Sequence, residues 1–396
     1  MTLNRFQSGP FYTRIRPFVF ICKAMATFPL QNIQASDGRE LKHRWCSAIF
    51  LYDIIVCLLI GTFFSYTSYC LVQEVKGQDD KFYLVVWLYF TALAAGSRNF
   101  CQFVLCHYYA HKYPQLLTAL EDYYQGIGTE ILESRRYVFR LQLIPILRTV
   151  FFLIILTAAS YSFFIQFHGS TWVACASYVL INLWKELPMS MFICICAHLR
   201  PRFDQLVLGL AKIRESDDSP ESVKRLENLR LQYAAMMNIL GILQKCYGMQ
   251  LAFNILFFIL DTILQLFIFF VFTSSQNILL LTLSVYFFIA ACGVIFYIDR
   301  LERKMEGLLD ALNAFELEGK SLSLKYQLKL FITQIAARPI KISASGFCLI
   351  NNTLIAGLFG AIATYLIVML NFAPYIVEWA NDTMITRRQP QWQTSF

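Results

Sequence analysis

The segment Gly360–Phe372 reads GAIATYLIVMLNF, a hydrophobic run that contains Thr364, Tyr365 and, after five apolar residues, Asn371. The predominantly apolar segment extends back to position 347, so it is long enough for a helix across a lipid bilayer, which takes about 20 residues. Bulk lipid does not favour hydroxyl and carboxamide groups. We therefore expect one side of this helix to face something other than lipid.

The rest of the chain has the same apolar character. Of its 396 residues, 57% are hydrophobic and 15% are charged, whereas a soluble domain has about 25% charged residues. Seven segments are apolar and long enough to span a bilayer, at 46–72, 82–106, 142–167, 172–198, 247–272, 278–298 and 347–372. The predicted fold class is an all-α integral membrane protein with seven transmembrane helices.

The distribution of basic residues predicts the orientation in the membrane. Of the 34 lysines and arginines, 27 lie in the N-terminal segment and in the loops after spans 2, 4 and 6, and four lie on the other side. Basic loops stay in the cytoplasm, so we expect a cytoplasmic N-terminus and an extracellular C-terminus. G-protein-coupled receptors have the opposite orientation. We interpret Asp299 and Arg300, after span 6, as solvated charges at a helix end.

Two of the cytoplasmic loops have a helical period of apolar residues. One stripe comprises Leu226, Leu229, Tyr233, Met236, Met237, Leu240 and Leu243, and a second comprises Met305, Leu308, Leu309, Leu312 and Phe315. Spans 4, 5 and 6 are therefore expected to continue beyond the membrane and to pack on each other. Both packing between subunits and packing within one subunit fit this pattern.

Several classes of function lack their motifs. The chain has no glycine-rich phosphate loop, HExxH or GxSxG motif, so we expect no enzyme, no cofactor and no metal site. The net charge of +8 follows from the topology, so we expect no nucleic-acid binding. Most of the 12 cysteines are interpreted as buried hydrophobic residues, with a Cys70–Cys175 pair left open.

Small and polar residues form one stripe along the last span. They are Thr353, Gly357, Gly360, Thr364 and Asn371, spaced over 18 residues, which is five helical turns at about 3.6 residues per turn. Two interpretations remain open. Small residues let helices pack closely, and polar residues line a water-filled path. One helix cannot enclose a pore, but symmetric copies can.

The stretch TYLIVMLNF resembles the TYhhhhhQF signature of insect gustatory receptors, where h is apolar. The signature carries over to Thr364, Tyr365 and Phe372, whereas Asn371 stands where the family has Gln. The resemblance implies a tastant-gated, non-selective cation channel that is a homo- or heterotetramer with other gustatory subunits. It would lie in the plasma membrane of gustatory or other chemosensory neurons and mediate taste acceptance or avoidance, with a bitter or aversive role preferred. The alternatives are a related olfactory-type receptor and a membrane transporter.

The resemblance also assigns roles to the segments. Residues 1–45 are a cytoplasmic segment, 46–198 hold spans 1–4, 199–246 form a cytoplasmic helical loop, 247–298 hold spans 5 and 6, 299–346 form an anchor, 347–372 line the pore and 373–396 are an extracellular tail. At the outer end of the pore helix, Asn371 and Phe372 are expected to form the gate. In the tail, Asn381 begins an N-x-T glycosylation sequon.

Polar and aromatic groups within the predicted spans are candidates for ligand binding. Asp261 and Gln265 lie one turn apart in span 5, and Asp261 is expected either to contact a ligand or to pair with Arg98. A pairing of Lys185 with Glu186 is a further expectation. The aromatic candidates for the pocket are Tyr161, Tyr178, Trp184 and Tyr286.

Overall fold

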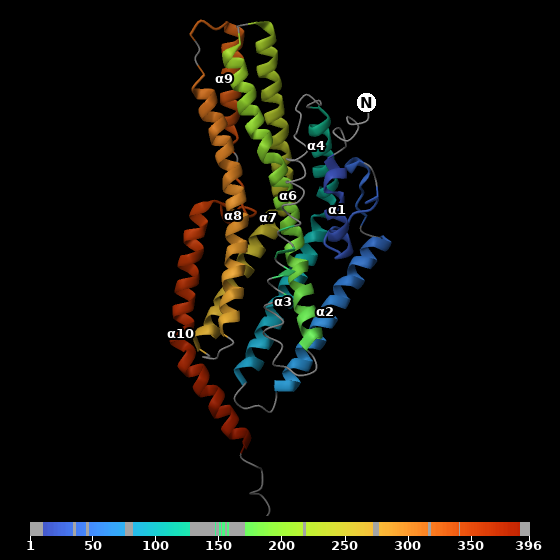
Figure 1. Ribbon diagram of the computed structural model, residues 1–396, viewed down its shortest axis with the longest axis vertical. Helices are drawn as coiled ribbons and strands as arrows, with labels where there is room; N and C mark the ends of the chain where they lie inside the picture. Colours follow the sequence, from blue (N-terminus) through green and yellow to red (C-terminus); the bar gives the residue numbers. More distant parts are fainter. Residues whose placement is uncertain are drawn as a thin grey trace, which may run out of the picture.

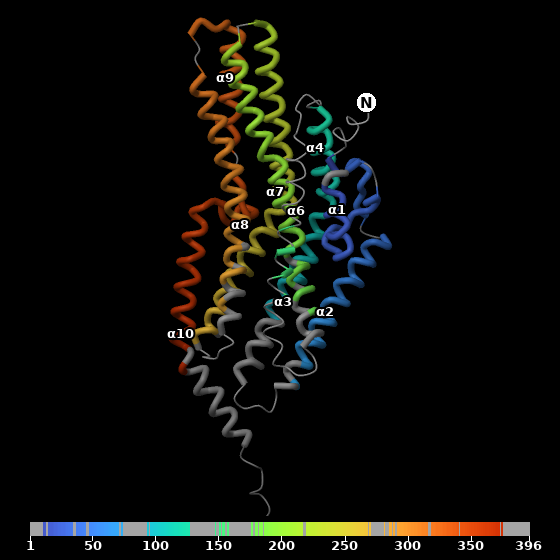
Figure 2. Tube along the Cα trace, viewed as in Figure 1, coloured from blue at the N-terminus to red at the C-terminus, as the bar shows by residue number. Residues whose placement is uncertain are grey.

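The computed structural model describes most of the chain. It covers residues 11–388 except 35–36, 45–46, 76–81, 127–146, 148–149, 152, 155–156, 158–170, 217–218, 272–276, 316–317 and 340. The described elements are α1 (Phe11–Ala24), the 3-10 turn η2 (Gly38–Glu40), α2 (Ala48–Val75), α3 (Phe82–Tyr108), the 3-10 turn η4 (Ala110–Lys112), α4 (Tyr113–Gly126), α6 (Thr171–Glu215), α7 (Pro220–Val271), α8 (Asn277–Asn313), α9 (Leu322–Ala337) and α10 (Asn352–Arg388). The prediction of an all-helical fold is confirmed for these residues (Figures 1 and 2).

Six of the predicted spans fall on observed helices, namely α2, α3, α6, α7, α8 and α10, whereas the span predicted at 142–167 lies largely outside the described residues. Within the described part of the chain, three helical segments are long and apolar enough to cross a bilayer. They are Ala48–Cys70, Pro220–Phe267 and Asn352–Phe372.

Three helices extend well beyond the length of a membrane span. α6 has 45 residues, α7 has 52 and α8 has 37, and each runs without a break from a predicted span into the predicted loop. A helix of 52 residues is about 78 Å long, more than twice the thickness of a bilayer core. The three helices contact one another along the elongated molecule (Figure 1).

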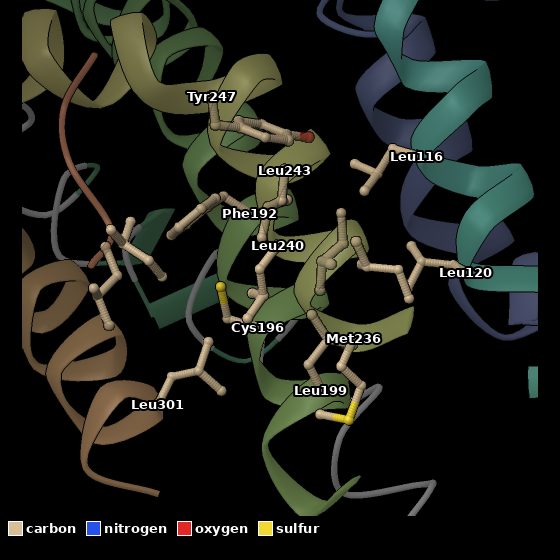
Figure 3. Packing of buried hydrophobic residues seen from close by; sticks show 14 of the residues in the cluster. Leu116, Leu120, Phe192, Cys196, Leu199, Met236, Leu240, Leu243, Tyr247 and Leu301 are labelled. Carbon is tan, nitrogen blue, oxygen red and sulfur yellow. The ribbon is translucent and has the colours of Figure 1, made fainter. Parts of the chain in front are cut away.

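The apolar stripes of the two loops form the core of this bundle. Tyr233 and Met236 of α7 and Leu308 and Leu312 of α8 are fully buried. Figure 3 shows a neighbouring part of this core. Phe192, Cys196 and Leu199 of α6 lie among Met236, Leu240, Leu243 and Tyr247 of α7, with Leu301 of α8 on one side and Leu116 and Leu120 of α4 on the other. Since these side chains are buried inside one chain, the stripes serve packing within the subunit.

The N-terminal segment is folded onto the bundle. α1 contacts α4 and α6, and its Tyr12, Phe11 and Val19 are fully buried. The carboxylate of Glu121 in α4 accepts hydrogen bonds from the backbone N–H groups of Phe11 at 2.8 Å and Tyr12 at 2.7 Å. A buried carboxylate thus satisfies two free N–H groups at the start of α1.

The last helix begins later than the predicted span and continues beyond it. α10 begins at Asn352 and not at 347, because residues 342–350 form a turn in which Ser345 (φ 50°) and Gly346 (φ 85°) have left-handed backbone conformations that a helix excludes. It ends at Arg388, beyond the predicted end at 372, and Pro374 lies inside it. The helix contacts α7 and α8 (Figure 1).

The interpretation of Asp299 as a solvated charge is wrong. Helix α8 continues past this residue to Asn313, and Asp299 is only 8% exposed. Arg300 does lie on the exposed side of α8, over the ring of Phe296.

Candidate functional site

The polar stripe of α10 lies on the side opposite its buried side. Leu358 and Ile362 are 5% and 7% exposed, and they face the rest of the chain. The stripe residues are all exposed: Thr353, Gly357, Gly360, Thr364 and Asn371. The two sets lie about half a turn apart on a helix with 3.6 residues per turn. The fold of one chain therefore leaves the whole stripe uncovered.

The glycines of the stripe are not packed against a neighbouring helix of the same chain. A Cβ atom placed on Gly357 or on Gly360 would have no heavy atom within 4 Å among its neighbours. Within the described part of the chain, these glycines therefore make no close contact with another helix. The stripe is therefore exposed for contact with a second subunit, with lipid or with water.

The expected gate residues are also exposed. Tyr365 is 60% exposed and Phe372 is 59% exposed, and Asn371 beside it is exposed too. Large aromatic side chains on an uncovered face of a membrane helix are suited to contact with another copy or with lipid. The structure places Thr364, Tyr365, Asn371 and Phe372 on one continuous outer surface of α10.

A second constellation lies between α3, α6 and α7. Arg98 of α3 donates a hydrogen bond to the Asp261 carboxylate of α7 at 2.5 Å, and its other terminal nitrogen is 3.4 Å from the Asn182 side-chain oxygen of α6. The side chains of Arg98 and Asp261 are 4% and 14% exposed. Of the two expectations for Asp261, the structure therefore has the ion pair with Arg98.

The polar side chains continue along the same helices. Asn254 of α7 donates to the side-chain oxygen of Gln102 in α3 at 3.4 Å, and Gln250 donates to the hydroxyl of Tyr113 at 3.2 Å. All four of these side chains are buried. Buried amides of this kind are normally paired with each other or with water, because an unpaired one costs about 1–3 kcal/mol.

Two side chains near the ion pair have polar atoms without a partner among the described residues. Asn99, next to Arg98, is 4% exposed, and both its amide nitrogen and its amide oxygen lack a hydrogen bond. The indole N–H of Trp184 in α6 is also buried and unpaired, and its ring lies 6.3 Å from that of Phe103, one helical turn after Asn99. Among the described residues, these unpaired groups of α3 and α6 comprise one acceptor, the Asn99 amide oxygen, and two donors, the Asn99 amide nitrogen and the Trp184 indole N–H.

The predicted pocket residues differ in burial, and some of their side chains lie outside the described residues. Gln265 and Trp184 are 3% and 2% exposed, and Tyr286 of α8 is half-buried. The side chains of Tyr161, Tyr178 and Lys185 lie outside the described residues, so the expected pairing of Lys185 with Glu186 does too. Cys70 is a free thiol. The sequence analysis did not single out Asn99, Gln102 and Asn182, although polar residues inside an apolar helix are a signal that finds them.

A further buried charged group lies nearer the N-terminus of the chain. The carboxylate of Asp53 in α2 is fully buried and lies 3.1 Å from Lys23 Nζ of α1 and 3.3 Å from His107 Nε2 of α3. Burial lowers the pKa of Lys23, and the neighbouring Asp53 carboxylate opposes this effect. Within the described residues, no group of three or more His, Cys, Asp or Glu side chains is arranged to hold a metal ion.

Comparison with known proteins shows which family and which solved structures this chain is similar to. A family model described as "7tm Chemosensory receptor" matches residues 15–376. The curated proteins that were compared with the chain include no match. Two solved structures of the insect olfactory receptor OR5 from Machilis hrabei, one in complex with eugenol, are similar to the chain with a TM-score of 0.60 each. Their sequence identities are 13% and 14%, and each comparison covers 91% of this chain and 99% of the receptor.

At such identity, the likeness to OR5 concerns the fold alone. The family match does not depend on the likeness to OR5. It covers the chain from α1, through Arg98 and Asp261, to the stripe of α10. The chain therefore belongs to the 7tm chemosensory receptor family, the insect receptors of the olfactory and gustatory type.

Proposed function

We propose that the chain is a subunit of a ligand-gated, non-selective cation channel that responds to small tastants in the plasma membrane of chemosensory neurons. The observation that carries the proposal is the uncovered polar stripe of α10, opposite Leu358 and Ile362. Hydroxyl, carboxamide and glycine positions on one side of a membrane helix suit contact with water and hydrated ions. The same side is not used for packing within the chain.

A single stripe cannot surround a path for ions, so the channel needs several copies. We propose four subunits around a central axis, each contributing α10, with a cytoplasmic N-terminus and an extracellular C-terminus. Closed symmetric assemblies are the usual form of homo-oligomers, and the 27 basic residues on one side support this orientation. In this arrangement, Asn371 and Phe372 lie at the outer mouth and form its narrowest ring.

A taste role is preferred over an olfactory one because of the ending of the signature, Thr364 to Phe372. The olfactory alternative has the structural similarity to OR5 in its favour, but that similarity concerns the fold. Family membership favours either receptor over a transporter. Within the taste role, an aversive or bitter response is the preferred one.

The ligand is proposed to bind near Asn99 and Trp184, whose unpaired polar groups suit a small molecule that both donates and accepts hydrogen bonds. Asp261 is already engaged by Arg98, so a cationic tastant would have to compete with the guanidinium group. An uncharged aromatic or terpenoid compound with a hydroxyl or carbonyl group fits this site better.

The test is to express the chain alone, and with other subunits of the family, in cells without chemosensory receptors. Membrane currents are recorded during application of bitter compounds, sugars and odorants that include eugenol. We expect a current evoked by tastants whose reversal potential lies between those of Na⁺ and K⁺. Gly360→Trp places a large ring on the stripe and should abolish the current while surface expression persists, since a Cβ atom at this position meets no other described helix within 4 Å.

Two outcomes would count against the proposal. One is a current that persists in Gly360→Trp at normal surface expression, which would put the ion path elsewhere. The other is a purified protein that stays monomeric in lipid bilayers and conducts no ions with any compound. A response to odorants and to no tastant would select the olfactory alternative.

A further inference from the structure

The start of α10 is attached to α8 through an acidic side chain. One carboxylate oxygen of Asp299 accepts the backbone N–H of Asn352 at 3.2 Å, and the other accepts the side-chain amide of Asn352 at 2.8 Å. Arg303, one turn further along α8, is 2.8 Å from the second oxygen. Both oxygens of this buried carboxylate are therefore used, and hydrogen bonds to an ionised acceptor are stronger than neutral ones.

This attachment is not needed to begin the helix. The side-chain oxygen of Asn351 already accepts the N–H of Leu354 at 3.3 Å, which is the hydrogen bond of an ordinary N-terminal cap. The contact with Asp299 comes in addition and joins residues 53 positions apart. Its effect is to hold the first residue of α10 at one place on α8.

A second carboxylate of α8 holds the turn that precedes α10. Glu302 Oε1 accepts the backbone N–H of Ile342 at 2.8 Å. Burial raises the pKa of Glu302, and the hydrogen bond from Ile342 opposes this. Because Asp299 and Glu302 are three residues apart, they lie on the same side of α8. The beginning of the turn and the beginning of α10 are thus attached to one helix.

The turn between these two attachments is closed on itself. Ile350 donates its N–H to the carbonyl of Ile342 at 3.0 Å, and Ala344 donates to the carbonyl of Cys348 at 2.9 Å. The side chains of Ile342, Ala344 and Ile350 are 3%, 0% and 0% exposed. A turn that is cross-bonded and buried in this way opens less readily than an exposed loop does, so we expect its two ends to move together.

Helix α7 holds the turn from another side. Gln244 donates its side-chain amide to Ser343 Oγ at 2.6 Å. Next to it, a Cβ atom on Gly248 would lie 3.0 Å from Ser345 Oγ and 3.1 Å from Ser345 N, so glycine at this position allows the turn to approach α7 closely. The turn is therefore bonded to both of the long helices that α10 contacts.

From these contacts, we propose that Asp299 and Glu302 are positioning residues that couple α8 to α10. The proposal rests on the proposed function, in which α10 lines the ion path. Helix α8 is continuous from Asn277 to Asn313 and contacts α6, the helix that carries Trp184 of the proposed ligand site. A shift of α8 caused by a ligand is passed through Asp299 and Asn352 to the start of α10.

The first measurement is the ligand response of variants on α8. Asp299→Asn keeps the shape but loses a charge and turns a donor toward the amide of Asn352, so the ligand concentration for half-maximal current should shift about tenfold. Glu302→Ala removes the second attachment and should shift it in the same direction. Glu306→Gln is the matched control, because it removes one charge at an exposed position one turn along α8 from Glu302. Its ligand concentration for half-maximal current should stay within about twofold of that of the parent chain.

A swapped pair separates positioning from general stability. In the double variant Asp299→Asn and Asn352→Asp, a carboxylate again faces an amide, so the response should move back toward that of the parent chain. Asn352→Ala removes the side-chain bond from the α10 side and serves where Asp299→Asn does not reach the cell surface. Equal shifts in Asp299→Asn and Glu306→Gln, or a swapped pair that is worse than either single change, would overturn the proposal.

The second measurement needs no current. Amide hydrogen exchange of the purified full chain in lipid nanodiscs should be about tenfold faster across residues 342–356 in Asp299→Asn, and unchanged in Glu306→Gln. Unchanged exchange in Asp299→Asn overturns the proposal. Faster exchange together with no current in any variant, the parent chain included, supports the attachment and counts against the proposed channel function.

Discussion

Two buried charges that lie between helices of this protein have partners of opposite charge. Arg98 is paired with Asp261, and Asp53 with Lys23 and His107. An isolated charge in a low-dielectric interior costs several kcal/mol, so removal of one partner harms more than removal of both. This asymmetry makes the pairs testable.

Arg98→Met should lower surface expression and destabilise the protein by about 3 kcal/mol, because it leaves the partly buried Asp261 carboxylate without its partner. The double variant Arg98→Met and Asp261→Leu should recover most of this loss. Thermal unfolding of the purified protein, followed by tryptophan fluorescence, measures both effects. A double variant as unstable as Arg98→Met would show that the arginine acts through something other than this pair.

Phe372→Ala should raise the current in the absence of ligand several-fold, because a ring of large aromatic side chains closes a pore by excluding water. Asn371→Asp should shift the permeability toward divalent cations by adding negative charge at the mouth, whereas Asn371→Gln should keep function. Basal currents and reversal potentials are measured per channel at the cell surface. Normal values in both Phe372→Ala and Asn371→Asp would move the gate to another part of α10.

At the scale of the element, α10 is one helix with two chemically different sides. The buried side with Leu358 and Ile362 holds it against the bundle, and the polar stripe is left free. Gly357 and Gly360 pack against no other helix among the residues that the structure describes. The access of water to the stripe therefore depends on what surrounds the subunit in the membrane.

Thr364→Cys should react with a water-soluble thiol reagent about tenfold faster than Ile362→Cys, because thiols react as thiolates and need access to water. Ile362 is the matched control, since it lies two residues away and is only 7% exposed. Mass spectrometry of α10 peptides measures the labelling without interference, as residues 352–388 contain no native cysteine. Slow labelling at both positions would mean that the stripe packs on another helix or faces lipid.

At the scale of the whole molecule, the long ends of α6, α7 and α8 form a bundle outside the predicted membrane region, and the N-terminal segment is held beside it. The Glu121 carboxylate fixes the start of α1, and Gly38 N is 3.4 Å from the same side chain. The chain thus has one folded end that is rich in basic residues and another where α10 extends to Arg388.

An epitope at the N-terminus should be stained by antibody only after permeabilisation, and one after residue 388 should be stained on intact cells. The distribution of 27 basic residues on one side is the physical reason. Immunofluorescence on unfixed and permeabilised cells measures both. Staining of the N-terminal epitope on intact cells would reverse the proposed orientation and, with it, the position of the gate.

Asn381 should carry an N-linked glycan, because its N-D-T sequon follows the last predicted span on the proposed outer side. Glycosidase treatment should increase the gel mobility of the parent chain and leave that of Asn381→Gln unchanged. The second sequon, at Asn351, lies at the start of α10 and should remain unmodified. Equal shifts in the parent chain and in Asn381→Gln would assign the glycan elsewhere.

Local patterns along the chain were sufficient for the class of protein, the helices and the apolar sides of α7 and α8. The stripe with Tyr233 and Met236 could be predicted because a helix repeats every 3.6 residues, so neighbours in sequence decide which side is apolar. The polar stripe of α10 was visible for the same reason. Its role was not, because close packing and water contact require the same small and polar residues.

Partner choice depended on which helices meet, and only the tertiary arrangement decides that. Arg98 and Asp261 are 163 positions apart, and nothing in their local sequence selects that pair over a ligand. Asp299 looked like a surface charge because it follows an apolar span, yet the turn before α10 folds back and buries it against Asn352. Periodicity acts within one helix, whereas the pairing of buried charges follows from the low dielectric between helices that are distant in the chain.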